Sequence, residues 1–357
     1  MFSGKHILFF FGALLFSLLI NALMLRFVKT LGIRNGSETI IRWSDQVKPA
    51  LGGLSFYIIF LLSITLHSFI FSYTGSNIDF RFTGIVGATS LGFLMGLSDD
   101  AYNTRPVLKF FTQVLCGVIL VYSGTYISIF ESNIINYSLT IIWVVGLMNS
   151  INMLDNMDGI TTIVSIIISF TILILILINN ETDSVGMTIV IGLLASLFGF
   201  LYFNWNPSKM YMGDTGSQYL GVLLAALSVN YLWNPYLAQT VEFSLSRQLL
   251  IPLLSFVVPI VDTTTVVIKR ISNGNSPFIG GKDHTTHHLS YLGFSEKQVA
   301  ALIALISIVS STLVVFVIPK IMVWSHWYTF GFIAYFLVIF FVLFVIAKKN
   351  INKSIDD

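Results

Sequence analysis

The chain has 357 residues, of which 55% are hydrophobic, 14% aromatic and only 10% charged. So little polar surface cannot cover a soluble globule of this length, and a net charge of +2 without a basic block argues against nucleic-acid binding. One cysteine, Cys116, excludes a disulfide framework and a cysteine-ligated metal site. The composition predicts an all-α, polytopic integral membrane bundle that forms a single domain over residues 1–357.

Apolar runs of about 20 residues, enough to cross a hydrocarbon core of roughly 30 Å, recur along the chain. They predict about 10–11 transmembrane helices, the first retained in the membrane and not cleaved as a signal peptide. The spans cover residues 6–27, 51–72, 83–98, 108–124, 139–153, 159–178, 187–203, 215–233, 249–269, 297–319 and 325–347. Glycine and proline predict bends at Gly52, Gly53, Pro252 and Pro259. The sequence shows no internal repeat, so it gives no support to an inverted-repeat transporter.

Positive charge predicts the orientation of these spans. With the N-terminus outside, 15 of the 19 lysines and arginines fall in cytoplasmic segments, and only Lys5, Arg81, Arg247 and Lys320 lie outside. This distribution satisfies the positive-inside rule. We therefore expect an outside N-terminus and a cytoplasmic C-terminus.

Polar side chains gather in four short islands between the apolar runs. The islands are Asp99 and Asp100; Asn149, Asn152, Asp155, Asn156 and Asp158; Asn204, Lys209 and Asp214; and His284, His287 and His288. The predicted orientation depends only on lysine and arginine. It nevertheless places all four islands on the cytoplasmic side. Carboxylates and histidines that share one end of a bundle predict a functional site.

The residue types indicate metal and phosphate chemistry. Adjacent Asp99 and Asp100 repel one another, and a divalent cation would relieve them; oxygen ligands without thiolates favour Mg²⁺ or Mn²⁺. The glycines around Asp214 permit a tight backbone at a helix start, where free N–H groups suit phosphate. Lys109 and Lys209 are natural counter-charges for a pyrophosphate.

Each island alone has a commoner explanation. A carboxylate such as Asp158 is usually a helix cap or solvated, and a pair of aspartates in a loop is usually a solvated turn. The histidines can be polar loop residues or a zinc site, and Tyr211 an interfacial aromatic. These alternatives weaken together, because chance rarely places every cluster on one face.

Five motifs carry a family resemblance. They are Lys48-Pro-Ala-Leu-Gly-Gly-Leu; Gly-Leu-Ser-Asp99-Asp100 with Lys109; Asn152-Met-Leu-Asp155-Asn-Met-Asp158-Gly; Asn204-x-x-Pro207-x-Lys209-x-Tyr-Met-Gly-Asp214-Thr-Gly-Ser; and Asp283-His284-Thr-Thr-His287-His288-Leu. Over residues 45–295 the chain resembles the polyprenyl-phosphate N-acetylhexosamine-1-phosphate transferases, which are glycosyltransferases of the family 4 type. The resemblance implies a Mg²⁺-dependent enzyme of the bacterial inner membrane with its active site facing the cytoplasm. It implies transfer from a UDP-N-acetylhexosamine to undecaprenyl phosphate, with release of UMP, at the start of a lipid-linked cell-envelope glycan. A homodimer is one expected assembly.

The resemblance also implies roles for single residues. Asp214 is the expected magnesium ligand, with Asp100 as the second. The catalytic residues it implies are Asp99, Asp100, Asp155, His287 and His288. Substrate binding falls to Lys48, Lys109, Asn152, Asp158, Asn204, Lys209, Tyr211 and His284, with Tyr211 in the place of an aromatic that stacks on uracil.

Two departures from one subfamily bear on the sugar. The phospho-MurNAc-pentapeptide translocases have three consecutive histidines and a lysine shortly after the aspartate pair; this chain has His284-Thr-Thr-His-His and Asn103. Both favour a GlcNAc-type donor over UDP-MurNAc-pentapeptide, which stays the alternative. A cation-coupled transporter is the distant alternative and predicts ionisable residues near the bilayer midplane.

Overall fold

The computed structural model describes residues 3–31, 48–70, 80–179, 185–234, 243–276 and 281–349. Within these ranges the regular structure is helical, apart from one isolated β-bridge between Ala50 and Tyr211. The all-α prediction is confirmed. Three of the predicted cytoplasmic charges, Arg34, Arg42 and Lys353, lie outside the described residues, and the side of the membrane on which each end lies stays a prediction.

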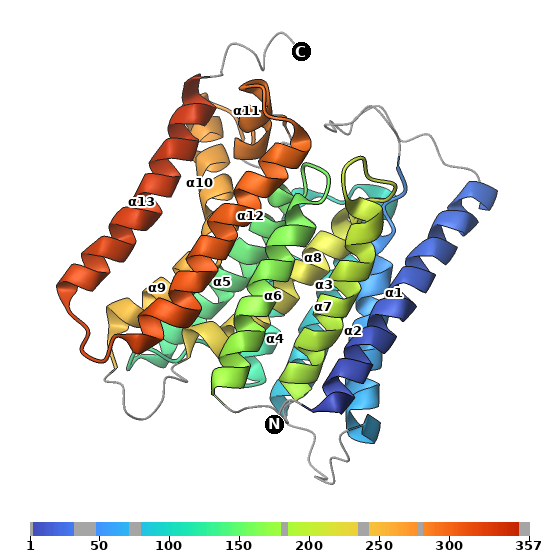
Figure 1. Ribbon diagram of the computed structural model, residues 1–357, viewed down its shortest axis with the longest axis horizontal. Helices are drawn as coiled ribbons and strands as arrows, with labels where there is room; N and C mark the ends of the chain where they lie inside the picture. Colours follow the sequence, from blue (N-terminus) through green and yellow to red (C-terminus); the bar gives the residue numbers. More distant parts are fainter. Residues whose placement is uncertain are drawn as a thin grey trace.

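Each of the predicted spans coincides with a helical segment (Figure 1). The segments are α1 (Gly4–Leu31), α2 (Gly52–Ile70), α3 (Phe80–Tyr102), α4 (Pro106–Tyr122), α5 (Asn133–Leu154), α6 (Ile160–Ile178), α7 (Val185–Asn204), α8 (Gly213–Ser228) continued by η1 (Val229–Trp233), α9 (Leu245–Ser255), α10 (Val257–Ser272), α11 (Thr285–Tyr291), α12 (Glu296–Thr312) continued by η2 (Leu313–Val317) and η3 (Ile318–Lys320), and α13 (His326–Lys349). Seven of the described helices are long and apolar enough to cross a membrane, and the α9–α10 pair makes an eighth if it is one bent span. The protein is therefore a multi-pass membrane protein.

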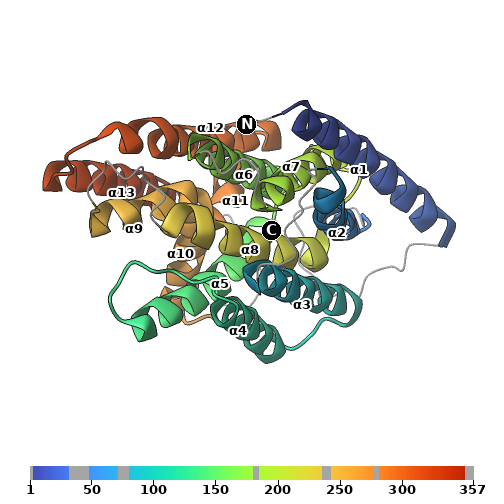
Figure 2. The ribbon, with the colours of Figure 1, turned by 90° about the horizontal axis from the view of Figure 1, so that it is seen from below.

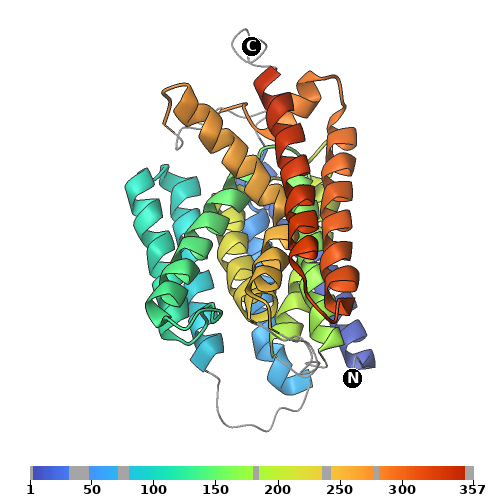
Figure 3. The same cartoon turned by 90° about the vertical axis from the view of Figure 1, so that its left-hand side faces the viewer.

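The predicted bend near Pro252 and Pro259 is confirmed. Helices α9 and α10 meet at 80°, with Phe256 between them. Pro252 lies inside α9, and Pro259 has no N–H to donate to the carbonyl of Ser255, so a continuous helix loses a hydrogen bond there. The bend inclines α10 relative to α13 (Figure 3).

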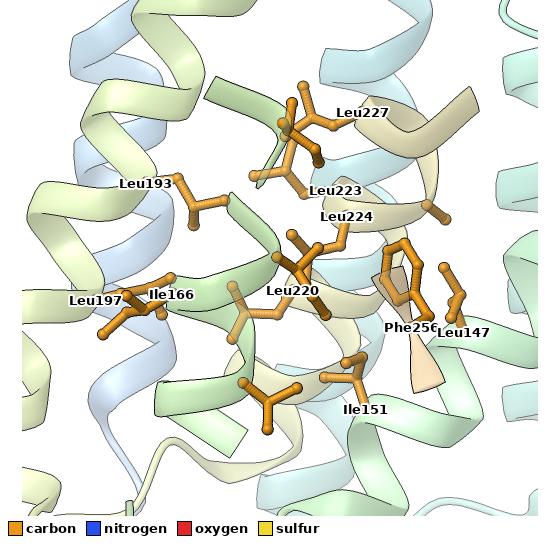
Figure 4. Close-up of a cluster of buried hydrophobic side chains, with 14 of the residues drawn as sticks. Leu147, Ile151, Ile166, Leu193, Leu197, Leu220, Leu223, Leu224, Leu227 and Phe256 are labelled. Atoms are coloured by element: carbon orange, nitrogen blue, oxygen red, sulfur yellow. The ribbon is translucent and has the colours of Figure 1, made fainter. Parts of the chain in front are cut away.

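Helix α8 occupies the middle of the bundle, surrounded by α2, α3, α5 and α6 (Figure 2). Every residue from Thr215 to Ser228 is buried. Its leucines, including Leu220 and Leu224, pack against side chains of α5, α6 and α7 and against Phe256 (Figure 4). Because lipid is as apolar as leucine, close packing and interhelical hydrogen bonds hold such a bundle together.

Two glycines fix how α3 meets the start of α8. A Cβ on Gly96 would overlap the backbone of Asp214 and Thr215, so only glycine allows this approach. Gly213, which begins α8, has φ +73°, a conformation that favours glycine. A Cβ there would also meet the Asp100 carboxylate at 2.6 Å. The last turn of α3 and the first turn of α8 are therefore packed directly against each other.

The polar islands meet at one end of the bundle. Helices α3, α5, α7 and α10 end there, α8 and α12 begin there, and α11 lies across it (Figure 1). The bridge between Ala50 and Tyr211 adds the segment before α2, since Gly52 N–H donates to Tyr211 O and Tyr211 N–H to Pro49 O. The prediction that the islands share one face is confirmed.

Candidate active site

A cleft of about 1290 Å³ opens at this end of the bundle. Residues from all four islands line it: Asp99 and Asp100; Asn149, Asn152, Asp155, Asn156 and Asp158; Asp214; and His284 and His287. Lys48, Lys109 and Tyr211 line it too. The cleft has an acidic wall, made by Asp99, Asp100, Asp155 and Asp214, and a basic wall, made by Arg270, Lys282, His284 and His287.

Asp100 caps the central helix. Its Oδ1 accepts from Asp214 N–H (3.0 Å), and its Oδ2 accepts from the N–H and Oγ1 of Thr215 (2.9 and 2.6 Å). A carboxylate suits this position because the first N–H groups of a helix lack intrahelical partners and carry partial positive charge. Both oxygens of Asp100 therefore bind the start of α8, across from α3.

Asp99 is buried and faces a different set of groups. Its Oδ1 accepts from the N–H and Oγ1 of Thr104 (2.8 and 2.7 Å), and its Oδ2 pairs with Lys109. The Lys109 ammonium also lies 3.6 Å from Asp214 Oδ2. The two adjacent aspartates therefore have different partners. Asp99 shares a cation with Asp214, whereas Asp100 holds the helix that carries Asp214.

Amides orient the remaining side of Asp214. Asn152 Nδ2 donates to Asp214 Oδ1 (2.7 Å) and contacts Ser217 Oγ at 2.8 Å. Behind Asn152, Gln113 exchanges hydrogen bonds with Asn149 and donates to Gln218 (3.2 Å). This chain of amides links α4, α5 and α8 beneath the acidic wall.

Asp155 follows the last turn of α5 and lines the cleft. Burial raises its pKa to about 7, and the carboxylates of Asp214 and Asp100 add to the rise. A carboxyl group with this pKa can accept or give a proton near neutral pH.

Asp158 and Lys48 hold the loop that precedes α8. Asp158 is buried, and its oxygens accept from Ser208 N–H (2.8 Å) and Ser208 Oγ (2.7 Å). The Lys48 ammonium lies 3.6 Å from Asp158 and 5.1 Å from the centre of the Tyr211 ring. Both side chains reach the cleft wall, but the contacts that the structure gives them also stabilise the loop.

Three predicted residues do not line the cleft. Asn204 is buried and braces the loop: its Oδ1 accepts from Gly159 N–H and Thr162 Oγ1, and its Nδ2 donates to Met210 O. The Lys209 ammonium lies over the Tyr202 ring, 5.8 Å from its centre. His288 contacts Lys269 through Nε2 at 2.6 Å. The substrate contacts expected of these residues stay predictions.

The basic wall consists of Arg270 of α10 and a later segment, residues 281–288, that is tied to α10. Arg270 pairs with both oxygens of Asp283 (2.7 and 2.8 Å), and His284 Nδ1 lies 2.8 Å from Asp262 Oδ2. Thr286 Oγ1 donates to Asn156 (2.6 Å) and so ties the segment to the end of α5.

Charge and burial set the protonation of this wall. Burial would raise the pKa of Asp283, but the Arg270 pair lowers it overall. Burial lowers the pKa of His287 to about 3, helped by His284, and that of His288 to about 4, helped by Lys269. Both of these imidazoles are therefore neutral at pH 7.

The site contains residues that were not singled out from the sequence. Arg270 and Lys282 line the cleft, and Asp262 stands behind His284. Asp262 carried a signal, since an acid in an apolar membrane helix marks a functional site by default. From the sequence, Arg270 and Lys282 only helped to predict the orientation of the spans.

The carboxylates fit a magnesium ion held jointly with substrate. Among the described residues there is no cluster of three or more acidic, histidine or cysteine side chains arranged to hold a metal. Mg²⁺ is usually bound by one or two carboxylates together with substrate phosphates. Asp99 and Asp214 already share one cation, Lys109, so the space between them accepts positive charge.

Comparisons with known proteins show which proteins the chain is similar to. The sequence profile of glycosyl transferase family 4 matches residues 82–232. A probable undecaprenyl-phosphate N-acetylglucosaminyl 1-phosphate transferase of Bacillus subtilis is 29% identical over an alignment of 354 residues that covers 96% of this chain and 93% of that protein. A decaprenyl-phosphate N-acetylglucosaminephosphotransferase of Mycobacterium leprae is 30% identical over an alignment of 281 residues that covers 72% of this chain and 70% of that protein.

Similarity to the translocase subfamily covers less of the chain. A phospho-N-acetylmuramoyl-pentapeptide-transferase of Streptococcus agalactiae is 33% identical over an alignment of 200 residues that covers 51% of this chain and 59% of that protein. The chain is therefore similar over nearly its whole length to a GlcNAc-1-phosphate transferase, and over about half its length to this translocase.

Proposed function

The chain belongs to glycosyl transferase family 4, and from this we propose that it transfers GlcNAc-1-phosphate from UDP-GlcNAc to undecaprenyl phosphate. The full-length similarity to the Bacillus subtilis enzyme supports this choice of substrates. We further propose that the protein lies in the bacterial inner membrane with its cleft facing the cytoplasm, where UDP-sugars are available.

The observation that carries the proposal is that groups of opposite charge line one cleft. Asp99 and Asp214, which share Lys109, line it together with Arg270, Lys282 and His284. A cleft of about 1290 Å³ exceeds the roughly 300–1,000 Å³ of a pocket for one drug-sized ligand, which leaves room for two substrates.

The acceptor lipid fits the rim beside the acidic wall. Leu97, Tyr102 and Phe110 line the cleft and are 40%, 83% and 47% exposed. Apolar side chains on α3 and α4 give a prenyl chain a surface along which it can lie, with its phosphate next to Lys109. The donor then occupies the remaining cleft, between Asp214 and the basic wall.

The reaction is a displacement at phosphorus. An oxygen of the lipid phosphate forms a bond to the sugar-linked phosphorus of the donor, the P–O bond to the UMP moiety breaks, and UMP leaves with the bonding electron pair. Lys109, Arg270 and Lys282 place positive charge around the phosphates, and Asp155 can take a proton from the lipid phosphate. Positioning and charge stabilisation supply most of the rate in such transfers.

Mg²⁺, when bound, would neutralise phosphate charge as the transfer proceeds. We propose Asp214 and Asp99 as its carboxylate ligands. The geometry favours Asp99 over Asp100 as the second ligand, because Asp99 Oδ2 shares the Lys109 cation with Asp214, whereas both oxygens of Asp100 accept hydrogen bonds from the start of α8. Asn152 orients Asp214, because its Nδ2 donates a hydrogen bond to Asp214 Oδ1.

A donor panel tests the proposal. Purified protein in nanodiscs is given undecaprenyl phosphate with UDP-GlcNAc, UDP-GalNAc or UDP-MurNAc-pentapeptide, and UMP release is measured with Mg²⁺ and with EDTA. We expect UMP from UDP-GlcNAc only when lipid and Mg²⁺ are both present. Preference for UDP-MurNAc-pentapeptide would instead assign the protein to peptidoglycan synthesis. UMP release without lipid would contradict transfer.

A further inference from the structure

Asp262 is a buried carboxylate inside α10, and both of its oxygens have hydrogen-bond partners. It is 1% exposed, and its Oδ2 lies 2.8 Å from His284 Nδ1. Its Oδ1 accepts from the N–H and Oγ1 of Thr285 (2.8 and 2.6 Å). An acid in an apolar helix is costly, and these three hydrogen bonds offset its burial.

The bond to Asp262 decides how His284 meets the cleft. A neutral imidazole carries one proton, and a carboxylate can only accept, so the proton sits on Nδ1. His284 lines the cleft, and its Nδ1 is turned towards α10. The opposite ring nitrogen, Nε2, is then the atom available to the cleft.

Anchoring of the segment does not depend on Asp262 alone, although Asp262 Oδ1 contributes to it by accepting from Thr285. Asp283 is tied to Arg270, Thr286 to Asn156 and His288 to Lys269. Three other contacts therefore hold the residues on either side of His284. The bond between Asp262 Oδ2 and His284 Nδ1 adds control over the orientation of the His284 ring.

We propose that Asp262 is a positioning residue for the transfer reaction: it holds His284 in the Nδ1-protonated tautomer, so that the unprotonated Nε2 is the atom that takes up a proton from a substrate phosphate and returns it to the phosphate of the departing UMP. This inference rests on the proposed function for its substrates. Its structural half, the tautomer of His284, is independent of any activity.

The first test is the tautomer in the wild-type protein. ¹⁵N-histidine-labelled protein in nanodiscs is examined by NMR, and the His284→Gln variant identifies the His284 signals by their loss. We expect Nδ1 to carry the proton and Nε2 to be unprotonated in the neutral ring. A proton on Nε2 alone would overturn the proposal. If the wild type releases no UMP, the proposed function fails while this measurement still stands.

The second test is Asp262→Asn. The two donors of Thr285 hold the amide oxygen, which turns the NH₂ group towards His284 Nδ1 and inverts the tautomer. We expect kcat to fall by about 100-fold or more, with KM changed less than about 3-fold and the thermal unfolding midpoint near that of the wild type. Thr264→Val, on the same helix, is the matched control.

A double variant distinguishes a positioning role of Asp262, which acts through His284, from a general packing role. In a His284→Gln background, Asp262→Asn should cause no further loss of kcat, because its effect passes through the ring. An equal loss in both backgrounds, or a single variant with near-wild-type kcat, would contradict the proposal. If Asp262→Asn does not fold, the wild-type tautomer decides alone.

Discussion

The two walls of the cleft are built in different ways. The acidic wall consists of helix ends: α3 and α5 stop, and α8 starts, where their backbones pack against each other, with Gly96 directly against the first turn of α8. The basic wall is mostly one segment, held to α10 by paired side chains such as Arg270 with Asp283. The geometry of the first wall follows from the packing of helix ends, and that of the second from one ion pair and several side-chain hydrogen bonds.

This difference predicts how each wall responds to substitution. In the acidic wall a carboxylate can act on chemistry, as Asp214 is placed to do, or on the fold, as Asp100 does. In the basic wall a substitution should displace a ligand-facing side chain and leave the bundle intact. The following variants separate these cases.

Asp214→Asn should give the largest loss. It removes the charge that Lys109 and a bound cation share while keeping the hydrogen bond from Asn152 sterically feasible. We expect UMP release to fall by about 1,000-fold, with an unchanged unfolding midpoint. Near-normal turnover would contradict the assignment of Asp214 to the metal.

Asp100→Ala should lower both activity and stability. It leaves Asp214 N–H, Thr215 N–H and Thr215 Oγ1 without their acceptor. Loss of a helix cap costs about 1–2 kcal/mol, and we expect turnover to fall by about 100-fold because Asp214 moves with the helix. The unfolding midpoint and UMP release are measured together. Lost activity with an unchanged midpoint would indicate that Asp100 acts directly on substrate.

Arg270→Gln should act mainly on donor binding. The change leaves the partly exposed Asp283 without its charge partner and loosens the start of the basic wall. We expect KM for UDP-GlcNAc to rise about 10-fold with a smaller change in kcat. Adding Asp283→Asn should recover part of the loss, and strictly additive effects would argue against the pair.

The neutral histidines should make stability depend on pH. The pKa of His287 is about 3 in the fold and about 6.5 when unfolded, so between these values the unfolded chain binds the extra proton. Acidification from pH 7 to pH 5 should cost about 2 kcal/mol through His287. Asp155, whose pKa is raised, acts in the opposite direction.

The difference between wild type and His287→Gln isolates this contribution. Unfolding midpoints of both proteins are measured from pH 7 to pH 5. The wild type should lose more stability on acidification than the variant. Parallel pH dependences would show that His287 is not buried in its neutral form.

Sequence predicted the spans and their shared polar end because apolar run length and charge are local properties. It could not tell Asp99 from Asp100, since neighbouring residues on a helix point about 100° apart and their partners lie on α4 and α8. It predicts a substrate contact for Asn204, which stays a prediction; the structure adds that both ends of this amide brace a loop.

Asp262 was missed for a related reason. Its partner His284 is 22 residues further along the chain, and no spacing rule connects a helix interior to a later segment. Only packing brings the two together. Sequence therefore located the acidic wall well, because its residues stand at span ends, and located the basic wall only through its histidines.

One measurement tests the central claim most directly: the stoichiometry of products from UDP-GlcNAc and undecaprenyl phosphate. UMP is quantified by chromatography and the lipid product by mass spectrometry, from the same reaction. We predict equal amounts of UMP and undecaprenyl diphosphate linked to GlcNAc, with no free phosphate. UMP without the lipid product, or release of free phosphate, would contradict a sugar-1-phosphate transfer.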